Sequence, residues 1–406
     1  MRGIIEMDLG SHELGQVDPV TRAALERALA GRAIDAAQAR ELIALPRDRL
    51  PLLLAVAGHV RTIRKGRTVT YSPKVFLPIT NLCRDRCGYC TFRKTPDEPG
   101  AWTMLPEEVR RACRGARAAG CIEALMCLGD KPERAFRSYR QTLAVLGHAT
   151  TIEYVERCCA IALEEGLLPH TNAGLMTRDE MTRLKRVNAS LGLMLETVSP
   201  RLRQTGGPHH RAPDKEPALR LQMIREAGEL QIPFTTGILL GIGETLNERV
   251  ESLAAIAELH ETYGHIQEII IQNFRAKPAT PMAAEDEPER EDVARAVAVA
   301  RLLLPDMNIQ APPNLSPYDL RLLLAAGIND WGGLSPVTCD FVNPEAPWPH
   351  VAMLAATCHE EGFTLVPRLP LYAEYLARPG FLDPAMRASI ASVNLPRGVS
   401  HAQFPT

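Results

Sequence analysis

Long hydrophobic runs and blocks of basic residues are both missing from this 406-residue sequence. The longest apolar runs lie around Leu52–Ala57 and Ile269–Ile271 and are far too short to cross a bilayer, so no membrane association is expected. The net charge of −2 argues against nucleic acid as the main partner. A signal peptide is also missing, so the ten cysteines are expected in a reducing cytoplasm and not in disulfides.

Three of the ten cysteines, Cys83, Cys87 and Cys90, lie within eight residues in the pattern C-x3-C-x2-C. The loop that carries them follows an apolar run typical of a strand, and no fourth cysteine lies nearby. A complete structural metal site normally uses four ligands. Three thiolates on one tight loop can instead hold three corners of an iron–sulfur cube and leave one iron open to a small molecule. The spacing therefore predicts a reactive cluster site at these three residues.

Other interpretations of the cysteine loop are less consistent with the pattern. A structural zinc site usually uses paired C-x2-C knuckles, and no second knuckle follows Cys90 at a suitable distance. The cluster could also arise by chance in a chain with ten cysteines, but the other seven show no comparable spacing. Most of the remaining seven lie inside apolar periodic stretches, as buried cysteines do: Cys113, Cys121, Cys127, Cys158, Cys159, Cys339 and Cys358.

Strand-like and helix-like segments alternate along most of the chain. Eight strands are expected, at Val75–Thr80, Glu123–Leu128, Leu167–His170, Ser190–Leu195, Ile232–Leu240, Glu268–Gln272, Met307–Gln310 and Gly327–Trp331. Helices are expected between them, and their number and length favour an α/β fold, a (β/α)8 TIM-type barrel, over an open sheet. We expect a helical N-terminal extension at 1–68, the barrel at 69–340, and a C-terminal α/β extension packed on the barrel at 341–406.

In such barrels the chemistry lies on the loops that follow the strands. The cysteine loop follows the first expected strand, and Gly129 and Asp130 follow the second. Glu196 ends the fourth strand, Gly241 ends the fifth, and Gln272 and Asn273 end the sixth. The polar features that stand out therefore fall at one mouth of the predicted barrel.

The cysteine loop, with Tyr89 just before its last cysteine, resembles the signature of radical S-adenosylmethionine enzymes. More narrowly, the chain resembles the family of ring-closing subunits of 7,8-didemethyl-8-hydroxy-5-deazariboflavin synthase. Four stretches carry this resemblance: Ile79–Phe92, Leu128–Glu133, Pro233–Thr245 and Asn329–Thr338.

The resemblance implies a 4Fe–4S cluster on the three cysteines that binds S-adenosylmethionine and, with one electron, releases a 5′-deoxyadenosyl radical. This radical would abstract hydrogen from a small-molecule adduct of tyrosine's hydroxybenzyl group with 5-amino-6-ribitylaminouracil. Ring closure with loss of ammonia, a carbon–nitrogen lyase reaction, would then form the deazaflavin. The implied partners are an external electron donor and a companion coupling subunit. A stand-alone chain that receives a diffusing intermediate is expected.

The resemblance also implies roles for individual residues. Gly129 and Asp130 would contact the methionyl amino group, although Gly-Asp is also a common turn dipeptide. Glu196 would accept hydrogen bonds from the ribose hydroxyls, or else form a salt bridge with a neighbouring arginine. The adenine would lie beside a further set of residues, of which the two aromatic ones are equally consistent with core packing: Gly237, Gly241, Gln272, Asn273, Tyr89 and Phe92.

The sequence motifs say less about which residues bind the substrate. Asp330 is expected near the mouth of the barrel, on its last strand, and is a candidate catalytic residue. His209 and His210 lie in a Gly/Pro-rich loop and are expected to be solvated, although such a loop could also form a lid or hold a proton acceptor. Lys131 is expected either to pair with a carboxylate or to lie at the surface.

Two classes of alternative function remain at this point. One is another radical enzyme with the same barrel: the companion coupling subunit, a menaquinone-pathway enzyme or a biotin-synthase-like sulfur inserter. The other is a non-enzymatic iron–sulfur protein or a zinc-binding module. Proteins of the second class are usually small and ligate their metal fully, which a large barrel with three ligands does not match.

Overall fold

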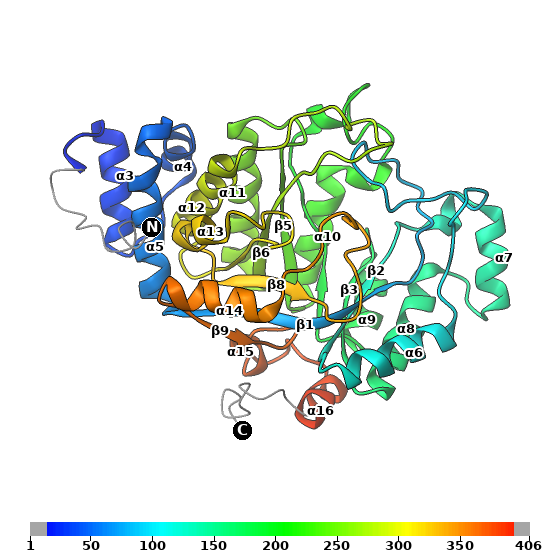
Figure 1. Ribbon diagram of the computed structural model, residues 1–406. Coiled ribbons are helices and arrows are strands. Elements are labelled where there is room, and N and C mark those ends of the chain that lie inside the picture. The colour runs from blue at the N-terminus through cyan, green and yellow to red at the C-terminus, as the bar shows by residue number, and fades with distance from the viewer. Residues whose placement is uncertain (1–13, 394–406) are drawn as a thin grey trace.

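The structure is a computed structural model, and it describes residues 14–393. Eight parallel strands form a closed barrel, in which each strand pairs with the next and β8 pairs back with β1 (Figure 1). The barrel strands are β1 Thr68–Pro78, β2 Glu123–Cys127, β3 Leu168–Asn172, β4 Ser190–Gly192, β5 Phe234–Leu240, β6 Ile266–Asn273, β7 Asn308–Gln310 and β8 Asp330–Leu334. The predicted barrel is therefore confirmed.

Helices surround the barrel on its outside (Figure 1). Those between the strands are α6 Pro106–Ala118, α7 Arg137–Val145, α8 Thr151–Glu164, α9 Arg178–Lys185, α10 Pro217–Glu229, α11 Leu246–Tyr263, α12 Arg290–Leu303 and α13 Leu320–Ala326. Short 3-10 turns are η1 Arg47–Arg49, η2 Pro132–Arg134, η3 Pro200–Arg203 and η4 Pro213–Lys215. Helices α8, α9 and α11 begin at capping boxes on Thr150, Thr177 and Thr245, which satisfy the first free backbone N–H groups of each helix.

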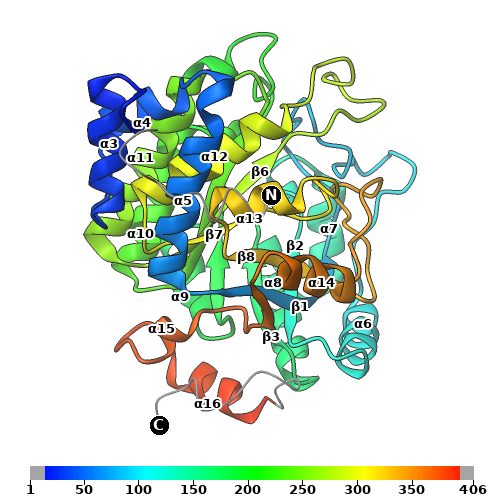
Figure 2. The same cartoon turned by 60° about the vertical axis from the view of Figure 1, so that its left-hand side comes forward.

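Helices α3 Pro19–Leu29, α4 Ala36–Ile43 and α5 Leu50–Lys65 precede the barrel. Helix α5 packs against α12 and α13, and Figure 2 shows these helices side by side. The buried Arg61 guanidinium donates hydrogen bonds to the carbonyls of Ile328 at 3.1 Å, Gly66 at 2.7 Å and Thr68 at 2.9 Å. Arg61 thereby ties α5 to the start of β1 and to the turn before β8.

Strand β1 is longer than predicted because it has two partners along one edge. Its second half pairs with β2, while residues 68–71 pair with β9, Thr364–Pro367, from the end of the chain. The sequence pattern indicated only the second half, since the first half depends on a partner almost 300 residues away.

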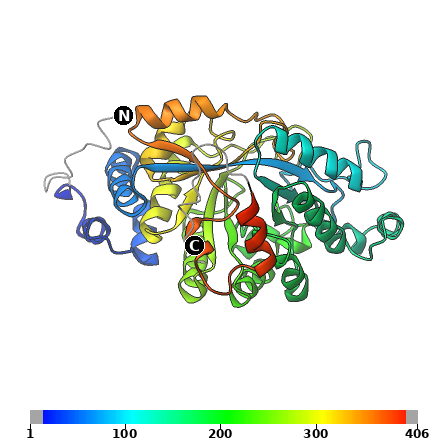
Figure 3. The same cartoon turned by 90° about the horizontal axis from the view of Figure 1, so that it is seen from below.

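The remaining helices are α14 Val351–Glu360, α15 Ala373–Leu376 and α16 Pro384–Ser392. The segment that contains α15 and α16 crosses the amino-terminal end of the barrel (Figure 3). There Leu369 and Leu371 belong to one apolar cluster with Ile122 and Ala189, which directly precede β2 and β4, and with Leu168, the first residue of β3. The tail therefore closes the barrel at the end opposite the cysteine loop. None of the helices in the described part of the chain combines the length and apolarity needed to cross a membrane.

Strand β8 begins three residues later than predicted. Helix α13 ends at Ala326, and Gly327 follows it in a left-handed conformation with φ 105°. The chain can become extended only after this glycine, so Asp330 is the first residue of β8. Its position at the amino-terminal end of the strand differs from the expected one near the mouth.

Candidate active site

The three cysteines of the loop after β1 line one cavity of about 200 Å³ and are free thiols. Within the described residues, their three Sγ atoms do not all lie within 4.8 Å of one another. A single tetrahedral zinc, with Zn–S bonds of about 2.3 Å, would require thiolate sulfurs roughly 3.8 Å apart. The three sulfurs are therefore not placed as ligands of one tetrahedral zinc.

Backbone amides point at one of these sulfurs. Cys83 Sγ accepts hydrogen bonds from the N–H of Asp130 at 3.2 Å and of Asp85 at 3.4 Å. N–H donors of this kind stabilise a thiolate ligand. In the metal-free protein burial raises the pKa of the Cys83 and Cys87 thiols, so metal binding must release protons. The donor set therefore fits an iron–sulfur cluster.

Two other loops at the mouth of the barrel, those that follow β4 and β6, hold the cysteine loop in place. The Gly88 N–H donates to the carbonyl of Pro208, in the loop after β4, at 2.7 Å. The Gly88 carbonyl accepts from the N–H of Met282, in the loop after β6, at 3.1 Å. The cysteine loop is thus fixed by tertiary contacts on both sides.

Gly129, which directly follows Leu128 at the end of β2, lies against the cysteine loop. A Cβ atom at this position would stand 2.1 Å from the Leu82 carbonyl oxygen and 2.6 Å from Cys83 Cβ. Only glycine permits this close approach. The neighbouring Asp130 carboxylate forms a salt bridge with Arg84 and accepts from the Leu175 N–H at 3.1 Å.

Three carboxylates gather beside the cysteine loop. Ligand oxygens of Asp85, Asp130 and Asp214 lie within 4.8 Å of one another, and all three residues are buried. Burial, together with the hydrogen bond and the negative charge of Asp214, raises the pKa of Asp85 to about 9. Arg220 Nη1 lies 3.2 Å from Asp214 Oδ2 and offsets part of the negative charge. At neutral pH one of these carboxyls therefore carries a proton.

Glu196 follows β4 in a left-handed conformation with φ 64°. Its N–H donates to the Gly237 carbonyl at 2.9 Å, which ties it to β5. Gly237 in turn approaches β6 so closely that a Cβ would stand 2.1 Å from the Ile270 carbonyl oxygen. The strained backbone of Glu196 is thus held by a glycine-dependent packing of β5 on β6.

Three side chains share the Glu196 carboxylate. The Tyr89 hydroxyl donates to Oε2 at 2.6 Å, His209 Nε2 lies 3.2 Å from the same oxygen, and Lys215 Nζ lies 2.6 Å from Oε1. Burial alone would raise the pKa of Glu196, but the charge of Lys215 and the hydrogen bond from His209 hold it well below its usual value. Glu196 is therefore an ionised carboxylate inside the protein.

The expectation of a solvated loop histidine is wrong for His209, which is 2 % exposed, because the loop after β4 folds onto Tyr89 and Glu196. His210 is exposed. The cation beside Glu196 is Lys215, not the arginine considered from sequence. Sequence reasoning missed Lys215, although it lies between β4 and α10 and so belongs to a mouth loop. Lys131 pairs with a carboxylate, that of Glu180, at 2.6 Å.

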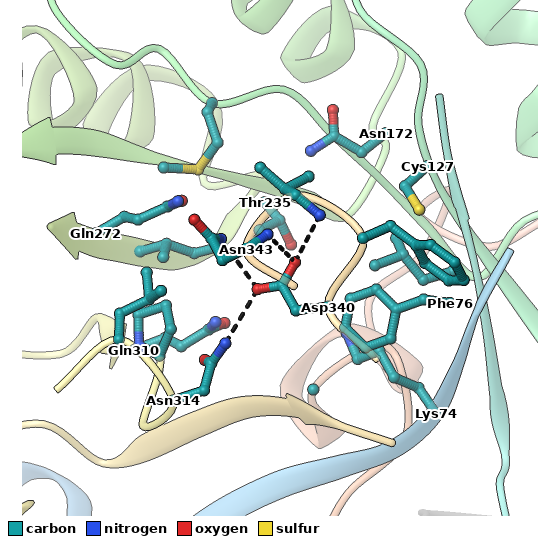
Figure 4. A pocket seen from close by; sticks show the side chains of 18 of the residues that line it. Lys74, Phe76, Cys127, Asn172, Thr235, Gln272, Gln310, Asn314, Asp340 and Asn343 are labelled. Carbon is teal, nitrogen blue, oxygen red and sulfur yellow. Dashed lines mark hydrogen bonds between the residues drawn. The ribbon is translucent and has the colours of Figure 1, made fainter. Parts of the chain in front are cut away.

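A second cavity, of about 310 Å³, occupies the barrel interior (Figure 4). Both cavities are lined by Tyr89, Asn172, Met194, Glu196 and Val342, so the two adjoin at these residues. A molecule in the barrel can therefore reach the space beside the cysteine loop.

Some of the remaining predicted site residues line one of the two cavities, and the others shape the backbone near them. Gln272 and Asn273 line the barrel cavity, and Phe92 lines the cavity of the cysteine loop. Gly237 and Gly241 are not among the residues that line either of these two cavities. Gly241, with φ 87°, instead shapes the turn after β5, where a Cβ would stand 2.6 Å from Pro288 Cδ.

Asp330 lies away from the mouth, at the closed end of the barrel. Its Oδ2 lies 2.6 Å from Arg368 Nε and its Oδ1 lies 3.0 Å from Arg368 Nη2. Thr70 and the Gly332 N–H also donate to this carboxylate, which is fully buried. Each of its oxygens is thus occupied by donors that join β1, β8 and the tail.

Known proteins resemble this chain in both sequence and structure. Residues 77–256 match the Radical SAM superfamily model. The 7,8-didemethyl-8-hydroxy-5-deazariboflavin synthase of Methanopyrus kandleri is 50% identical over 311 residues, which cover 76% of this chain and 93% of that protein. The FO synthase of Streptomyces coelicolor is 46% identical over 392 residues, which cover 93% of this chain but only 45% of that protein.

Among solved structures, the crystal structure of a maturase of the FeFe-hydrogenase matches 90% of this chain and 80% of its own, with a TM-score of 0.72 and 18% identity. At this level of identity the likeness supports the barrel fold alone. The sequence relatives, in contrast, do not favour the alternative radical enzymes or a non-enzymatic iron–sulfur protein. The chain belongs to the radical S-adenosylmethionine enzymes and, within them, to the family of 7,8-didemethyl-8-hydroxy-5-deazariboflavin synthases.

Proposed function

We propose that this chain closes the deazaflavin ring of 7,8-didemethyl-8-hydroxy-5-deazariboflavin by radical chemistry. The observation that carries the proposal is the junction of two cavities, one lined by three free thiols and the other filling the barrel. The names of relatives that align over most of their length support the same product. The substrate is the adduct of tyrosine's hydroxybenzyl group with 5-amino-6-ribitylaminouracil, and closure releases ammonia in a carbon–nitrogen lyase reaction.

Cys83, Cys87 and Cys90 would hold a 4Fe–4S cluster. When bound, the cluster supplies the electron that splits S-adenosylmethionine and yields the 5′-deoxyadenosyl radical. Hydrogen bonds to the loops that follow β2, β4 and β6 would hold the half-buried cysteine loop, and with it the cluster, at the mouth of the barrel.

Glu196 receives the ribose hydroxyls of S-adenosylmethionine, for which its ionised carboxylate is a strong acceptor. Gly129 and Asp130 receive the methionyl ammonium, whose positive charge suits the acidic group beside the cysteine loop. Gln272 and Asn273 contact the adenine from the barrel wall, while Tyr89 and Phe92 shield the cofactor. Gly237 and Gly241 do not contact the cofactor; Gly237 allows β5 to pack closely on β6, and Gly241 shapes the turn after β5.

Asp330, the candidate catalytic residue from sequence, is assigned a positioning role. Its carboxylate is bound to Arg368 on the closed side of the barrel, and it is not among the residues that line the barrel cavity. It thereby holds the tail against β1 and β8.

The coupling of tyrosine to the uracil is assigned to a companion activity outside these 406 residues. This is supported by the FO synthase of Streptomyces coelicolor, of which the chain aligns with only 45%. An external reductant supplies the electron.

The test is turnover of the synthetic tyrosine–uracil adduct by anaerobically reconstituted protein. We expect both 5′-deoxyadenosine and a fluorescent deazaflavin, and neither without a reductant. Cleavage of S-adenosylmethionine without the deazaflavin would refute ring closure. Formation of the deazaflavin from tyrosine and the uracil alone would refute the division of labour.

A further inference from the structure

The deep end of the barrel cavity is strongly polar. Glu123 on β2 and Glu268 on β6 both line it, and each is paired with a cation. Lys74 Nζ lies 2.8 Å from Glu123, and Arg368 Nη2 lies 2.8 Å from Glu268. Arg368 and Pro370 belong to the tail that closes the amino-terminal end of the barrel, so this end of the cavity is its floor. We use the term polar floor for five lining residues: Lys74, Glu123, His170, Glu268 and Arg368.

His170, on β3, has a defined tautomer in this floor. Its Nδ1 lies 2.6 Å from the Ser190 hydroxyl, and that hydroxyl donates to the Pro370 carbonyl at 2.6 Å. A serine has one hydroxyl proton, and a carbonyl can only accept. The Ser190 oxygen must therefore accept from His170, so Nδ1 carries the imidazole proton. Burial lowers the pKa of His170 to about 4, so the ring is neutral and Nε2 is left as an acceptor.

The space in front of this acceptor is open because of Gly192. A Cβ at Gly192 would stand 3.0 Å from His170 Nε2 and would cover it. Gly192 does not have a positive φ, so its backbone does not require glycine. The glycine instead leaves a lone-pair acceptor uncovered at the edge of the cavity.

We propose that the polar floor binds the polyhydroxylated side chain of the substrate, with a hydroxyl donating to His170 Nε2. This inference rests on the proposed function. The reacting carbon and nitrogen atoms of the adduct must lie near the cysteine loop, so its ribityl chain extends to the opposite end of the cavity. A hydroxyl both donates and accepts, which suits a floor that alternates carboxylates, cations and a neutral imidazole. His170 is thus a specificity-determining residue for the polyol.

The proposal is tested by binding of two ligands to the reconstituted protein without S-adenosylmethionine, measured by calorimetry. One ligand is the adduct with its ribityl group, and the other carries a methyl group in its place. Wild type should prefer the ribityl ligand. His170→Phe should reduce that preference by about 10-fold, the worth of one or two uncharged hydrogen bonds, and leave the methyl ligand unaffected. His170→Gln, whose amide oxygen can accept, should restore part of the preference.

Gly192→Ala is the second variant, since its Cβ would stand 3.0 Å from His170 Nε2 and crowd that acceptor while the histidine itself is kept, and it should weaken only the ribityl ligand. His148→Phe is the matched control, because His148 packs against Tyr154 outside the barrel cavity, and it should bind both ligands as wild type does. An unchanged preference in His170→Phe and Gly192→Ala would overturn the proposal, as would equal weakening of both ligands. A wild-type protein that binds the ribityl adduct with the expected preference but never forms deazaflavin would refute the proposed function instead.

Discussion

Lys215 Nζ lies 2.6 Å from Glu196 Oε1, and this buried ion pair joins the end of β4 to the loop before α10. The pair lies on the boundary between the two cavities, where Tyr89 also donates to the same carboxylate. A ligand hydroxyl that binds Glu196 must therefore share an acceptor that is already charged and oriented. The ion pair keeps the Glu196 carboxylate ionised, and it also fixes the loop between β4 and α10 against this residue.

Removal of both members of this pair should destabilise the protein by less than the sum of the two single removals. Lys215→Met leaves the Glu196 charge buried without its cation, and Glu196→Gln leaves Lys215 likewise. Each single variant should lower the free energy of unfolding by about 3–5 kcal/mol. The double variant should lose clearly less than the sum, as measured by denaturant unfolding of all four proteins. Strict additivity would show that the two charges do not stabilise one another.

Gly129→Ala should prevent correct assembly of the cysteine loop. The new methyl group would meet the Leu82 carbonyl and Cys83 Cβ, which are backbone or near-backbone atoms that cannot move aside. We expect a large loss of bound iron and sulfide after reconstitution. Gly115→Ala is the matched control, because Gly115 lies in α6 with no heavy atom within 4 Å of a new Cβ, and it should keep its full iron content. Equal iron in both variants would contradict the steric argument.

Cys87→Ala should abolish both 5′-deoxyadenosine and the fluorescent product, since two thiolates cannot hold the cluster in a reactive state. Cys339→Ala serves as the control, because Cys339 is exposed and lines neither cavity. Product formation is read by fluorescence and 5′-deoxyadenosine by chromatography. Survival of the deazaflavin signal in Cys87→Ala would exclude a cluster-dependent mechanism.

Asp330→Asn should act on stability and not on the chemical step. The substitution leaves the buried Arg368 guanidinium with one carboxylate partner in place of two, which should cost about 3 kcal/mol. The kcat for deazaflavin formation should stay near the wild-type value at temperatures where the variant is folded. A large fall in kcat with unchanged stability would restore the catalytic role considered for Asp330 from sequence.

His265 should make the protein less stable in mild acid. Burial between Phe234 and Tyr263 lowers its pKa to about 3, so it stays neutral in the folded protein while it binds a proton below its ordinary pKa of about 6.5 when unfolded. The unfolded state then binds more protons, so stability falls as the pH falls from about 6.5 towards about 3.

The expected slope is about 1.4 kcal/mol per pH unit for this histidine. His265→Phe should reduce it by that amount, measured by denaturant unfolding of the metal-free protein between about pH 7 and about pH 5. A parallel fall of wild type and variant over this range would show that His265 does not contribute.

The local pattern of apolar residues in the sequence was sufficient to predict much of the barrel. Apolar runs marked all eight barrel strands, although the first seven residues of β1 were missed. Parallel strands that are buried on both faces have continuous apolar sequences, such as Phe234–Leu240. The rule that chemistry follows the strands then placed the cysteines, Gly129 and Glu196 at one mouth. The cysteine spacing is itself local, since its three ligands come from one loop.

The partners of these residues depended on the folded chain. Lys215 and His209 reach Glu196 only because the loop after β4 folds back over the mouth, and no periodicity encodes that path. The start of β1 required a strand almost 300 residues away, and the floor of the barrel required the segment that follows this strand. Hydrogen bonds and ion pairs between distant segments form only when the barrel closes, so their identity follows from tertiary packing and not from any short stretch of sequence.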